Sequence, residues 1–229
     1  MARLILVYGQ PASGKTFALK TLDPKFTVII DGDRKGALPW RGWAKDYSAE
    51  KKNFFSVSSI DKTLELIEKI ATADEFKNVL TVVIDGFNNI LSNEETAYAN
   101  GWRRQYKNKL ELFDGIANKA AWLVEVASGY RKDLTVVFNA HVKTADPYVA
   151  GDRDRLFTPG KALEQKKKIE GKFLFTFYAK ADDEGNHFFE TAPHGSTARS
   201  SEGCFEFQIP NDMKFVIDTI NAYDKGETK

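Results

Sequence analysis

Four runs of apolar and β-branched residues, each bounded by polar or glycine-containing segments, lie in the first part of the chain. Runs of this kind predict strands that are buried on both faces, as in a parallel sheet. Between two of them, Leu64, Ile67 and Ile70 recur with helical spacing, and Asp61 is expected to cap that helix. The four runs are residues 3–8, 26–30, 79–84 and 134–138.

Helices are expected between these runs, so that strand and helix alternate. This alternation predicts an α/β fold with a mainly parallel sheet and right-handed crossover connections. The longest helical segment is expected to break near Gly101 and again near Gly115. The expected helices are residues 17–22, 61–71, 92–126 and 212–223, and residues 54–57 are expected to form a short additional strand.

The C-terminal part of the chain follows a different pattern. Residues 144–160 are polar and contain glycine and proline, which predicts a loop, and residues 161–168 are expected to form a short helix. Residues 172–179 alternate as a strand does, and the turn sequence DDEG at 182–185 leads to a second strand at 186–191. The phenylalanines expected on one face of the first of these strands are Phe173, Phe175 and Phe177.

Length and composition are those of an ordinary globular protein. The 229 residues are 42% hydrophobic and 28% charged, which predicts one domain over residues 1–229, with residues 172–210 as an antiparallel extension of the same sheet. No apolar run is long enough to span a bilayer, so no membrane partner is expected. The single cysteine, Cys204, excludes an intramolecular disulfide and favours a reducing, cytoplasmic location.

Charge and histidine content narrow the candidate chemistry. The formal net charge is +1, so any nucleic acid must bind through local basic patches. The three histidines and one cysteine show no metal-ligand spacing.

The strongest motif follows the first predicted strand. It matches G-x-x-x-x-G-K-[ST] at every fixed position, and a helix is expected to follow it, which is the context that a phosphate-binding loop requires. The backbone N–H groups of such a loop point at phosphate, the lysine bridges the β- and γ-phosphates, and the threonine hydroxyl binds Mg²⁺. The residues are Gly9, Gln10, Pro11, Ala12, Ser13, Gly14, Lys15 and Thr16.

Polar residues follow three further predicted strands. Asp85 ends the third run, where a carboxylate lies beside the phosphate loop and can bind Mg²⁺ with Thr16, although it could also simply cap the next helix. Asp31 and Asp33 follow the second run, and Asp33 is the candidate for orienting the attacking water, although DGD is also a good turn sequence. His141 follows the fourth run and is a candidate sensor of the γ-phosphate or an ordinary loop histidine.

At these residues the chain resembles the ATPase core of RecA-like recombinases. Four segments carry the resemblance, in the order GQPASGKT, VIIDGDRKGALP, TVVIDG and VVFNAH, and together they span about residues 3–180. The likeness is greatest to the small phage members that consist of the core alone and serve as single-strand annealing proteins. It implies a RecA-like P-loop fold that binds and hydrolyses ATP with Mg²⁺.

The resemblance also implies roles for individual residues. In the family, the strand after the first helix ends in IDAE, whose glutamate activates water; here the segment is IDGD, so Asp33 takes that role with a shorter side chain. The family's glutamine that couples the γ-phosphate to a DNA-binding loop is replaced by His141. The implied catalytic residues are therefore Lys15, Asp33, Asp85 and His141.

The resemblance implies single-stranded DNA as a partner. The first DNA-binding loop of the family corresponds to about residues 93–109, where cations would track phosphates and aromatic rings would stack on bases. A solvated helical face explains the same charge run equally well. The candidate DNA-binding residues are Trp102, Arg103, Arg104, Lys107 and Lys109.

A second loop corresponds to residues 143–160 and is followed by a lysine cluster, residues 166–168. Because family members form filaments or rings with ATP between subunits, this cluster could contact either DNA or the ATP of a neighbouring subunit. A homo-oligomer is therefore expected, and a single-strand-binding protein is a further candidate partner.

These observations favour an ATP-dependent protein that binds single-stranded DNA and anneals or pairs strands during recombination. A P-loop small-molecule kinase that uses Asp31 and Asp33 as its substrate site is the main alternative. A DNA-remodelling motor subunit and an inactive nucleotide-binding scaffold also remain open.

Overall fold

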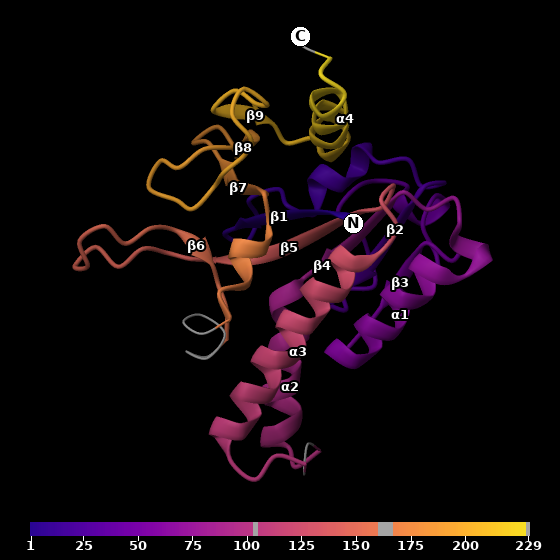
Figure 1. The fold of residues 1–229 in the computed structure, drawn as a ribbon, viewed down its shortest axis with the longest axis vertical. Coiled ribbons are helices and arrows are strands. Elements are labelled where there is room, and N and C mark those ends of the chain that lie inside the picture. The colour runs from indigo at the N-terminus through magenta and orange to yellow at the C-terminus, as the bar shows by residue number, and fades with distance from the viewer. Residues whose placement is uncertain (103–104, 160–166, 228–229) are drawn as a thin grey trace.

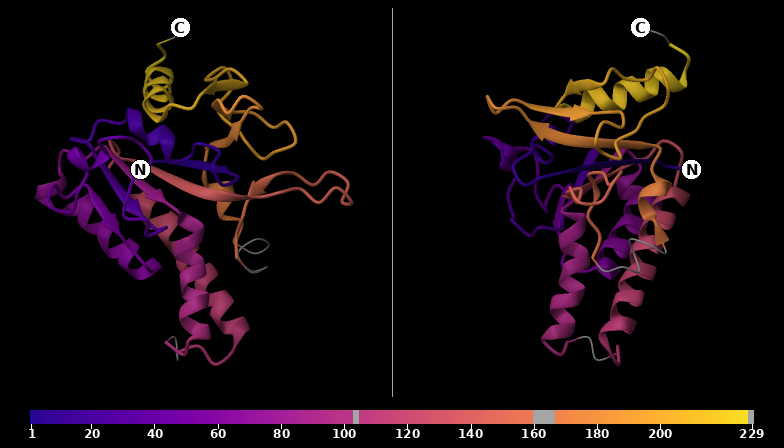
Figure 2. Two further views of the ribbon diagram at one scale, coloured as in Figure 1. Left: turned by 180° about the vertical axis from the view of Figure 1, so that it is seen from behind. Right: turned by 90° about the vertical axis from the view of Figure 1, so that its left-hand side faces the viewer.

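The computed structural model describes residues 1–102, 105–159 and 167–227. Its centre is a mostly parallel sheet with helices on both faces, so the molecule is an α/β protein of three layers (Figure 1). Helices α1, α2 and α3 lie on one side of the sheet, and α4 lies on the other (Figure 2).

Nine strands form the sheet within the described part of the chain. The first six strands of the order given below are mutually parallel, whereas β8 and β9 join antiparallel and continue the same sheet. The short strand β6 (Arg155–Leu156) pairs with the far end of β5. From one edge to the other, the strands are β3 (Phe54–Ser56), β2 (Thr27–Asp31), β4 (Thr81–Asp85), β5 (Thr135–Lys143), β1 (Arg3–Gly9), β7 (Phe175–Ala181), β8 (His187–Glu190) and β9 (Gln208–Pro210).

Four α-helices connect or follow these strands in the described residues. None of them combines the length and the apolar composition that crossing a membrane requires. The α-helices are α1 (Ile60–Thr72), α2 (Phe87–Ala99), α3 (Lys109–Gly129) and α4 (Met213–Asp224). Short 3₁₀ helices cover Phe17–Thr21, Trp43–Lys45, Asp74–Phe76 and Ile169–Lys172.

Alternation along the central strands divides the apolar core in two. In β1, Leu4, Leu6 and Tyr8 face the layer of α1, α2 and α3, while Ile5 and Val7 face α4. Both sets are buried, which explains why the central strands read as continuous apolar runs.

Two segments project from this body. Helices α2 and α3 lie side by side and extend well beyond the sheet, so that residues 100–102 and 105–108 lie at the tip of a helical hairpin (Figures 1 and 2). The chain between β5 and β6 forms a separate arm (Figure 1), and its Tyr148 is 95% exposed. Both projections lie in the segments that the sequence predicts to bind DNA.

The sequence prediction is right about the α/β class, the parallel strands and the antiparallel pairing of β7 with β8, but several elements differ. Strand β7, expected within the antiparallel extension, lies parallel to β1. Phe17–Thr21 is a 3₁₀ helix rather than an α-helix, because Leu22 is already extended and only one short turn fits before Pro24. The cap of α1 is Ser59, whose side chain accepts from the Lys62 N–H, and not Asp61.

The long helical segment also differs. It begins earlier, at Phe87, and its break lies between α2 and α3, whereas Gly115 lies inside α3 without interrupting it. A Cβ on Gly115 would lie 2.6 Å from the Tyr106 ring, so this glycine allows Tyr106 to pack against α3. The predicted loop at residues 93–109 is helical at both ends, because α2 runs to Ala99 and α3 begins at Lys109.

The C-terminal expectations need two corrections. Strand β7 begins only at Phe175, and Phe173 belongs to the preceding turn, so Phe173 packs on the opposite face from Phe175 and Phe177. The predicted loop at 144–160 contains β6, because β5 runs on to Lys143 and provides a strand to pair with. The predicted helix at 161–168 falls almost entirely outside the described residues.

Phe138 of β5 ties the α2–α3 layer to the sheet. Its ring meets Phe87 at 5.4 Å and Phe173 at 5.2 Å between centroids, both edge-on, and it is fully buried. We predict that Phe138→Ala lowers the free energy of unfolding by about 3–5 kcal/mol, measured by urea denaturation. The control Trp122→Ala, at a side chain 59% exposed on α3, should cost far less; equal losses in the two variants would contradict this packing.

Candidate active site

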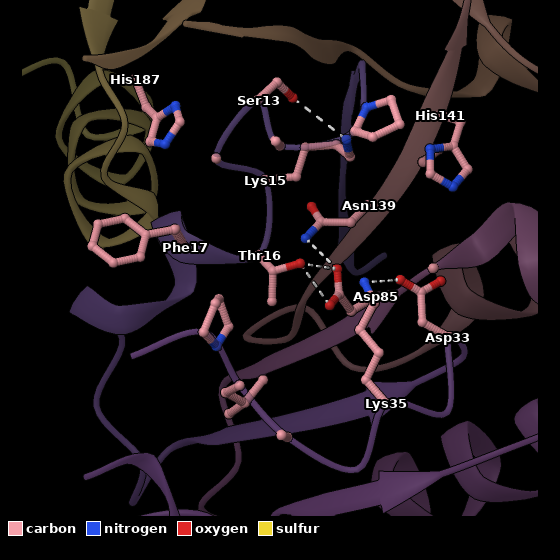
Figure 3. A pocket seen from close by; sticks show the side chains of 18 residues that line it. Ser13, Lys15, Thr16, Phe17, Asp33, Lys35, Asp85, Asn139, His141 and His187 are labelled. Carbon is pink, nitrogen blue, oxygen red and sulfur yellow. Dashed lines mark hydrogen bonds and ion pairs between the residues drawn. The ribbon is translucent and has the colours of Figure 1, made fainter. Parts of the chain in front are cut away.

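The carboxyl ends of the parallel strands bring the predicted site residues to one edge of the sheet. Strand register sets Asp31 beside Asp85 and Asp85 beside Asn139, while Gly9 lies beside His141. The candidate phosphate loop, residues 9–16, lies at this edge and lines one side of an open cavity of about 570 Å³ (Figure 3). The sequence predicted this convergence from the strand ends alone.

Two glycines allow the phosphate loop to pack tightly. A Cβ on Gly9 would lie 2.4 Å from the Ala179 carbonyl oxygen of β7, so a larger residue would push the strand away. Gly14 has φ +87°, and its Cβ would lie 2.7 Å from Cγ of His187. The antiparallel extension therefore supports the loop from behind, a contact that the sequence did not predict.

Lys15 folds back over its own loop. Its ammonium donates to the carbonyl oxygens of Gly9 at 2.9 Å and Gln10 at 2.7 Å. Burial lowers the pKa of Lys15 to about 8, and the negative charges of Asp85 and Asp33 only partly oppose this effect. A partly buried ammonium with too little negative charge around it favours an anionic ligand such as phosphate.

Asp85 is held by two neighbours from different elements. The Thr16 hydroxyl lies 2.9 and 3.1 Å from its two oxygens, and Asn139 Nδ2 donates to Oδ1 at 2.9 Å. Asp85 is only 6% exposed, and burial raises its pKa, although both hydrogen bonds act in the opposite direction. The alternative of a helix cap is not supported, because α2 begins after Gly86 with no side-chain cap.

The same group of residues fits a divalent cation. The Asn139 Oδ1 atom is buried and has no hydrogen-bond partner among the described residues, and it lies on the amide that contacts Asp85. Carboxylate, amide and hydroxyl oxygens are the ligands that Mg²⁺ prefers, and it commonly completes its shell with water and substrate phosphate. Among the described residues, no group of three or more histidine, cysteine or acidic side chains could hold a metal ion without other ligands.

Asp33 lies on the other side of the cavity in a fixed position. Its Oδ1 accepts from Asn89 Nδ2 at 2.5 Å, and its Oδ2 pairs with the Lys35 ammonium at 2.6 Å. Gly86, with φ +83°, allows this approach, because a Cβ there would lie 2.0 Å from Asp33 Oδ1. The carboxylate is thus fixed by α2 and by the turn that follows β4.

Asp31 has a structural role instead. Its carboxylate accepts from the Ser56 hydroxyl at 3.0 Å and from the Gly36 N–H at 2.9 Å. It is buried beneath the loop that carries Lys35, and it does not line the cavity. A kinase substrate site made of Asp31 and Asp33 together is therefore not supported by this arrangement.

His141 lines the cavity from β5, at the start of the arm. Its backbone N–H donates to Asn88 Oδ1, and Asn88 Nδ2 donates in turn to the Phe157 carbonyl beyond β6. Burial and the nearby charge of Lys15 lower the pKa of the His141 imidazole, which favours the neutral form of the ring. A neutral ring can donate from one nitrogen and accept at the other.

Nine further residues line the cavity but are not among the predicted site residues, and four of them have polar or aromatic side chains (Figure 3). Asn139 could have been found, because it is a polar residue directly after a buried run. For Lys35, Phe17 and His187, the neighbouring sequence gives no indication of a place in the site. His187, for example, reaches the cavity only through the pairing of β8 with β7. The four residues are Phe17, Lys35, Asn139 and His187.

The described candidate DNA-binding residues, Trp102, Lys107 and Lys109, lie apart from this cavity, at the tip of the α2–α3 hairpin. Trp102 is 74% exposed, and Lys107 and Lys109 are exposed as well. Arg103 and Arg104 lie outside the described residues. A solvated tip and a binding surface would both have this appearance, so the geometry leaves the two interpretations of the charge run open.

The arm is linked to the phosphate loop more directly. Gln10 Nε2 donates to the Thr144 hydroxyl at 3.0 Å, at the point where the arm leaves β5. The base of the arm is held by Asp154, whose carboxylate accepts from the Tyr178 hydroxyl at 2.7 Å and the Ala145 N–H at 2.8 Å. In the lysine cluster, Lys166 lies outside the described residues.

Neither the models of known protein families nor the curated protein sequences gave a match to the chain. The motif resemblance and the chemistry of the cavity therefore carry the functional proposal by themselves.

The pKa of Lys15 predicts how stability changes with pH. Between pH 8 and its ordinary value of 10.5, the unfolded chain retains a proton that the folded protein has lost, so the free energy of unfolding rises with pH in this window. Relative to Lys15→Met, the parent protein should gain up to about 3 kcal/mol between pH 7.5 and 10, measured by urea denaturation. Lys20→Met is the control on an exposed lysine nearby, and parallel pH curves for the parent and Lys15→Met would refute the shift.

Proposed function

We propose that this protein is a Mg²⁺-dependent ATPase of the RecA-like P-loop type that binds single-stranded DNA. The observation that carries the proposal is the contact between the Thr16 hydroxyl and the Asp85 carboxylate at 2.9 Å, within a cavity that also holds Lys15. The loop and the acid come from separate strands, β1 and β4, with β5 between them. A chance match to the loop motif would not require an acid at this position.

Each residue has a role in this proposal. Thr16 and Asp85 would hold Mg²⁺, whose charge would stabilise the phosphate oxygens, and Lys15 would contact the β- and γ-phosphates. Asp33 would orient and deprotonate the attacking water. Its fixed position beside Asn89 and Gly86 supports this role despite the side chain being shorter than glutamate.

DNA binding is the part of the proposal that rests most on the resemblance. The two projections supply exposed aromatic rings, Trp102 on the helical hairpin and Tyr148 on the arm. The Gln10–Thr144 hydrogen bond and the place of His141 at the root of the arm offer a route from the γ-phosphate to the arm. An oligomer with ATP between subunits remains part of the proposal through the resemblance alone.

Substitutions at three charged residues of the cavity, Lys15, Asp33 and Asp85, should separate by role. Lys15→Ala should abolish ATP hydrolysis, because it removes the main side-chain contact to the transferred phosphate. Asp85→Asn should weaken Mg²⁺-dependent nucleotide binding, whereas Asp33→Asn should leave binding unchanged and lower the turnover rate about 10²–10⁴-fold. Calorimetry with a non-hydrolysable ATP analogue gives the binding, and phosphate release gives the rate.

Asp74→Asn serves as the matched control, since this exposed aspartate lies outside the cavity. Near-normal turnover in Lys15→Ala would show that the loop is not the active site. Transfer of phosphate to a small hydroxylated metabolite, in preference to water, would favour the kinase alternative.

Single-stranded DNA is predicted to bind through the tip of the helical hairpin. Trp102→Ala should cost about 1–3 kcal/mol of binding free energy at any salt concentration if the ring stacks on a base. Arg103→Ala with Arg104→Ala should instead reduce the slope of log affinity against log salt by up to about 1.4, at about 0.7 for each phosphate contact. Fluorescence anisotropy at several salt concentrations tests both, and unchanged affinity and slope in all variants would place the DNA site elsewhere.

A further inference from the structure

We propose that Lys35 is a second phosphate-binding lysine of this site. When ATP binds, the Lys35 ammonium moves from the Asp33 carboxylate to the γ-phosphate, and Asp33 is then free to act on water. The inference rests on the proposed ATPase function and adds a residue that the phosphate-loop motif does not contain. Its basis is the ion pair that Lys35 makes with Asp33 at 2.6 Å inside the cavity wall.

Both oxygens of Asp33 are engaged. Oδ2 pairs with the Lys35 ammonium, and Oδ1 accepts from Asn89 Nδ2 at 2.5 Å. With a donor already on each oxygen, an attacking water would have to displace one of these two contacts to reach the carboxylate. Asp33 therefore needs its Lys35 partner to move before it can take a proton from water.

The two partners differ in freedom of movement. The Asp33 side chain is 11% exposed and lies against Gly86, where no Cβ intervenes. The Lys35 side chain is 65% exposed and has a flexible four-carbon stem, so the exposed end of the pair can leave at little cost. Lys35 is the mobile partner, and Asp33 stays in place.

The backbone holds Lys35 within reach of the cavity. Arg34 has a left-handed φ of 56°, and the Lys35 and Gly36 N–H groups donate to the buried Asp31 carboxylate at 3.4 and 2.9 Å. Figure 3 shows the Lys35 side chain extending beside Asp85 to reach Asp33. Movement of the side chain alone would bring the ammonium toward the space that Lys15 and Thr16 also line.

Charge explains why ATP, and not ADP, would draw Lys35 away. The terminal phosphate of ATP carries more negative charge than the single charge of Asp33, and charge-assisted hydrogen bonds to phosphate are strong. ADP presents no such group at that distance from the loop. The exchange therefore makes the release of Asp33 depend on the group that is to be cleaved.

The released carboxylate then takes part in a balanced step. The water oxygen bonds to the γ-phosphorus as the bond from that phosphorus to the bridging oxygen breaks, and the electron pair of the broken bond stays on the ADP oxygen. Asp33 accepts the proton from water and later passes it to solvent, so that ADP, phosphate and a proton are the products.

Lys35→Gln, Lys35→Arg and the control Lys62→Gln test this assignment. Lys62 is an exposed lysine of α1 outside the cavity, so its substitution changes the net charge equally. Affinities for a non-hydrolysable ATP analogue and for ADP, each with Mg²⁺, would be measured by calorimetry together with the turnover rate. Thermal unfolding would verify that all variants fold.

Lys35→Gln should lower the affinity for the ATP analogue at least about tenfold while leaving ADP affinity nearly unchanged, and its turnover should fall. Lys35→Arg should recover most of both, and Lys62→Gln should match the parent. An unchanged ratio of ATP to ADP affinity in Lys35→Gln would overturn the assignment, whether turnover stays the same or rises. An unchanged ratio would still leave the proposed ATPase function intact if the parent binds nucleotide and Lys15→Ala does not. A parent protein that binds no nucleotide would overturn both the ATPase function and the role of Lys35.

Discussion

The burial of Asp85 at the end of β4 is the constraint on which the candidate site depends. A carboxylate with so little exposure needs compensation, and Thr16 and Asn139 supply one hydrogen-bond donor each but no positive charge. The buried ammonium of Lys15 lies in the same cavity, bonded to loop carbonyls instead. Burial thus works against the charge of both groups, raising the pKa of the acid and lowering that of the lysine. A cation at Asp85 together with phosphate at Lys15 would relieve both effects at once.

Parallel strand order explains why the site forms at this edge. Strands β1, β5 and β4 lie next to one another, and their carboxyl ends deliver the phosphate loop, Asn139 and Asp85. The sequence predicted that the site residues gather at this edge. A buried apolar run followed by a polar residue marks the end of a strand, even when the order of the strands in the sheet is unknown. Lys15, Asp33, Asp85 and His141 all line the cavity as expected.

Other positions in the structure could not be predicted from the pattern of apolar and polar residues along the chain. The pairing of Lys35 with Asp33 depends on a left-handed residue at Arg34, in a segment without clear period. His187 reaches Gly14 only because the C-terminal hairpin pairs beside β1, through a contact between residues far apart in sequence. Phe173 was placed on the wrong face because the alternating pattern was begun at residue 172, three residues before the true start of β7. In each case a long-range pairing or a backbone turn, and not side-chain periodicity, decides the position.

The central claim, that the cavity binds a Mg²⁺-nucleotide through Thr16 and Asp85, is tested most directly by equilibrium unfolding of the protein with ATP analogue, with and without Mg²⁺. At a concentration of 100 times the dissociation constant, binding should raise the free energy of unfolding by about 2.7 kcal/mol. Thr16→Val keeps the side-chain size but removes the hydroxyl, so it should lose the part of this gain that requires Mg²⁺. No gain at millimolar nucleotide, or a gain in Thr16→Val with the same dependence on Mg²⁺ as in the parent, would contradict the account.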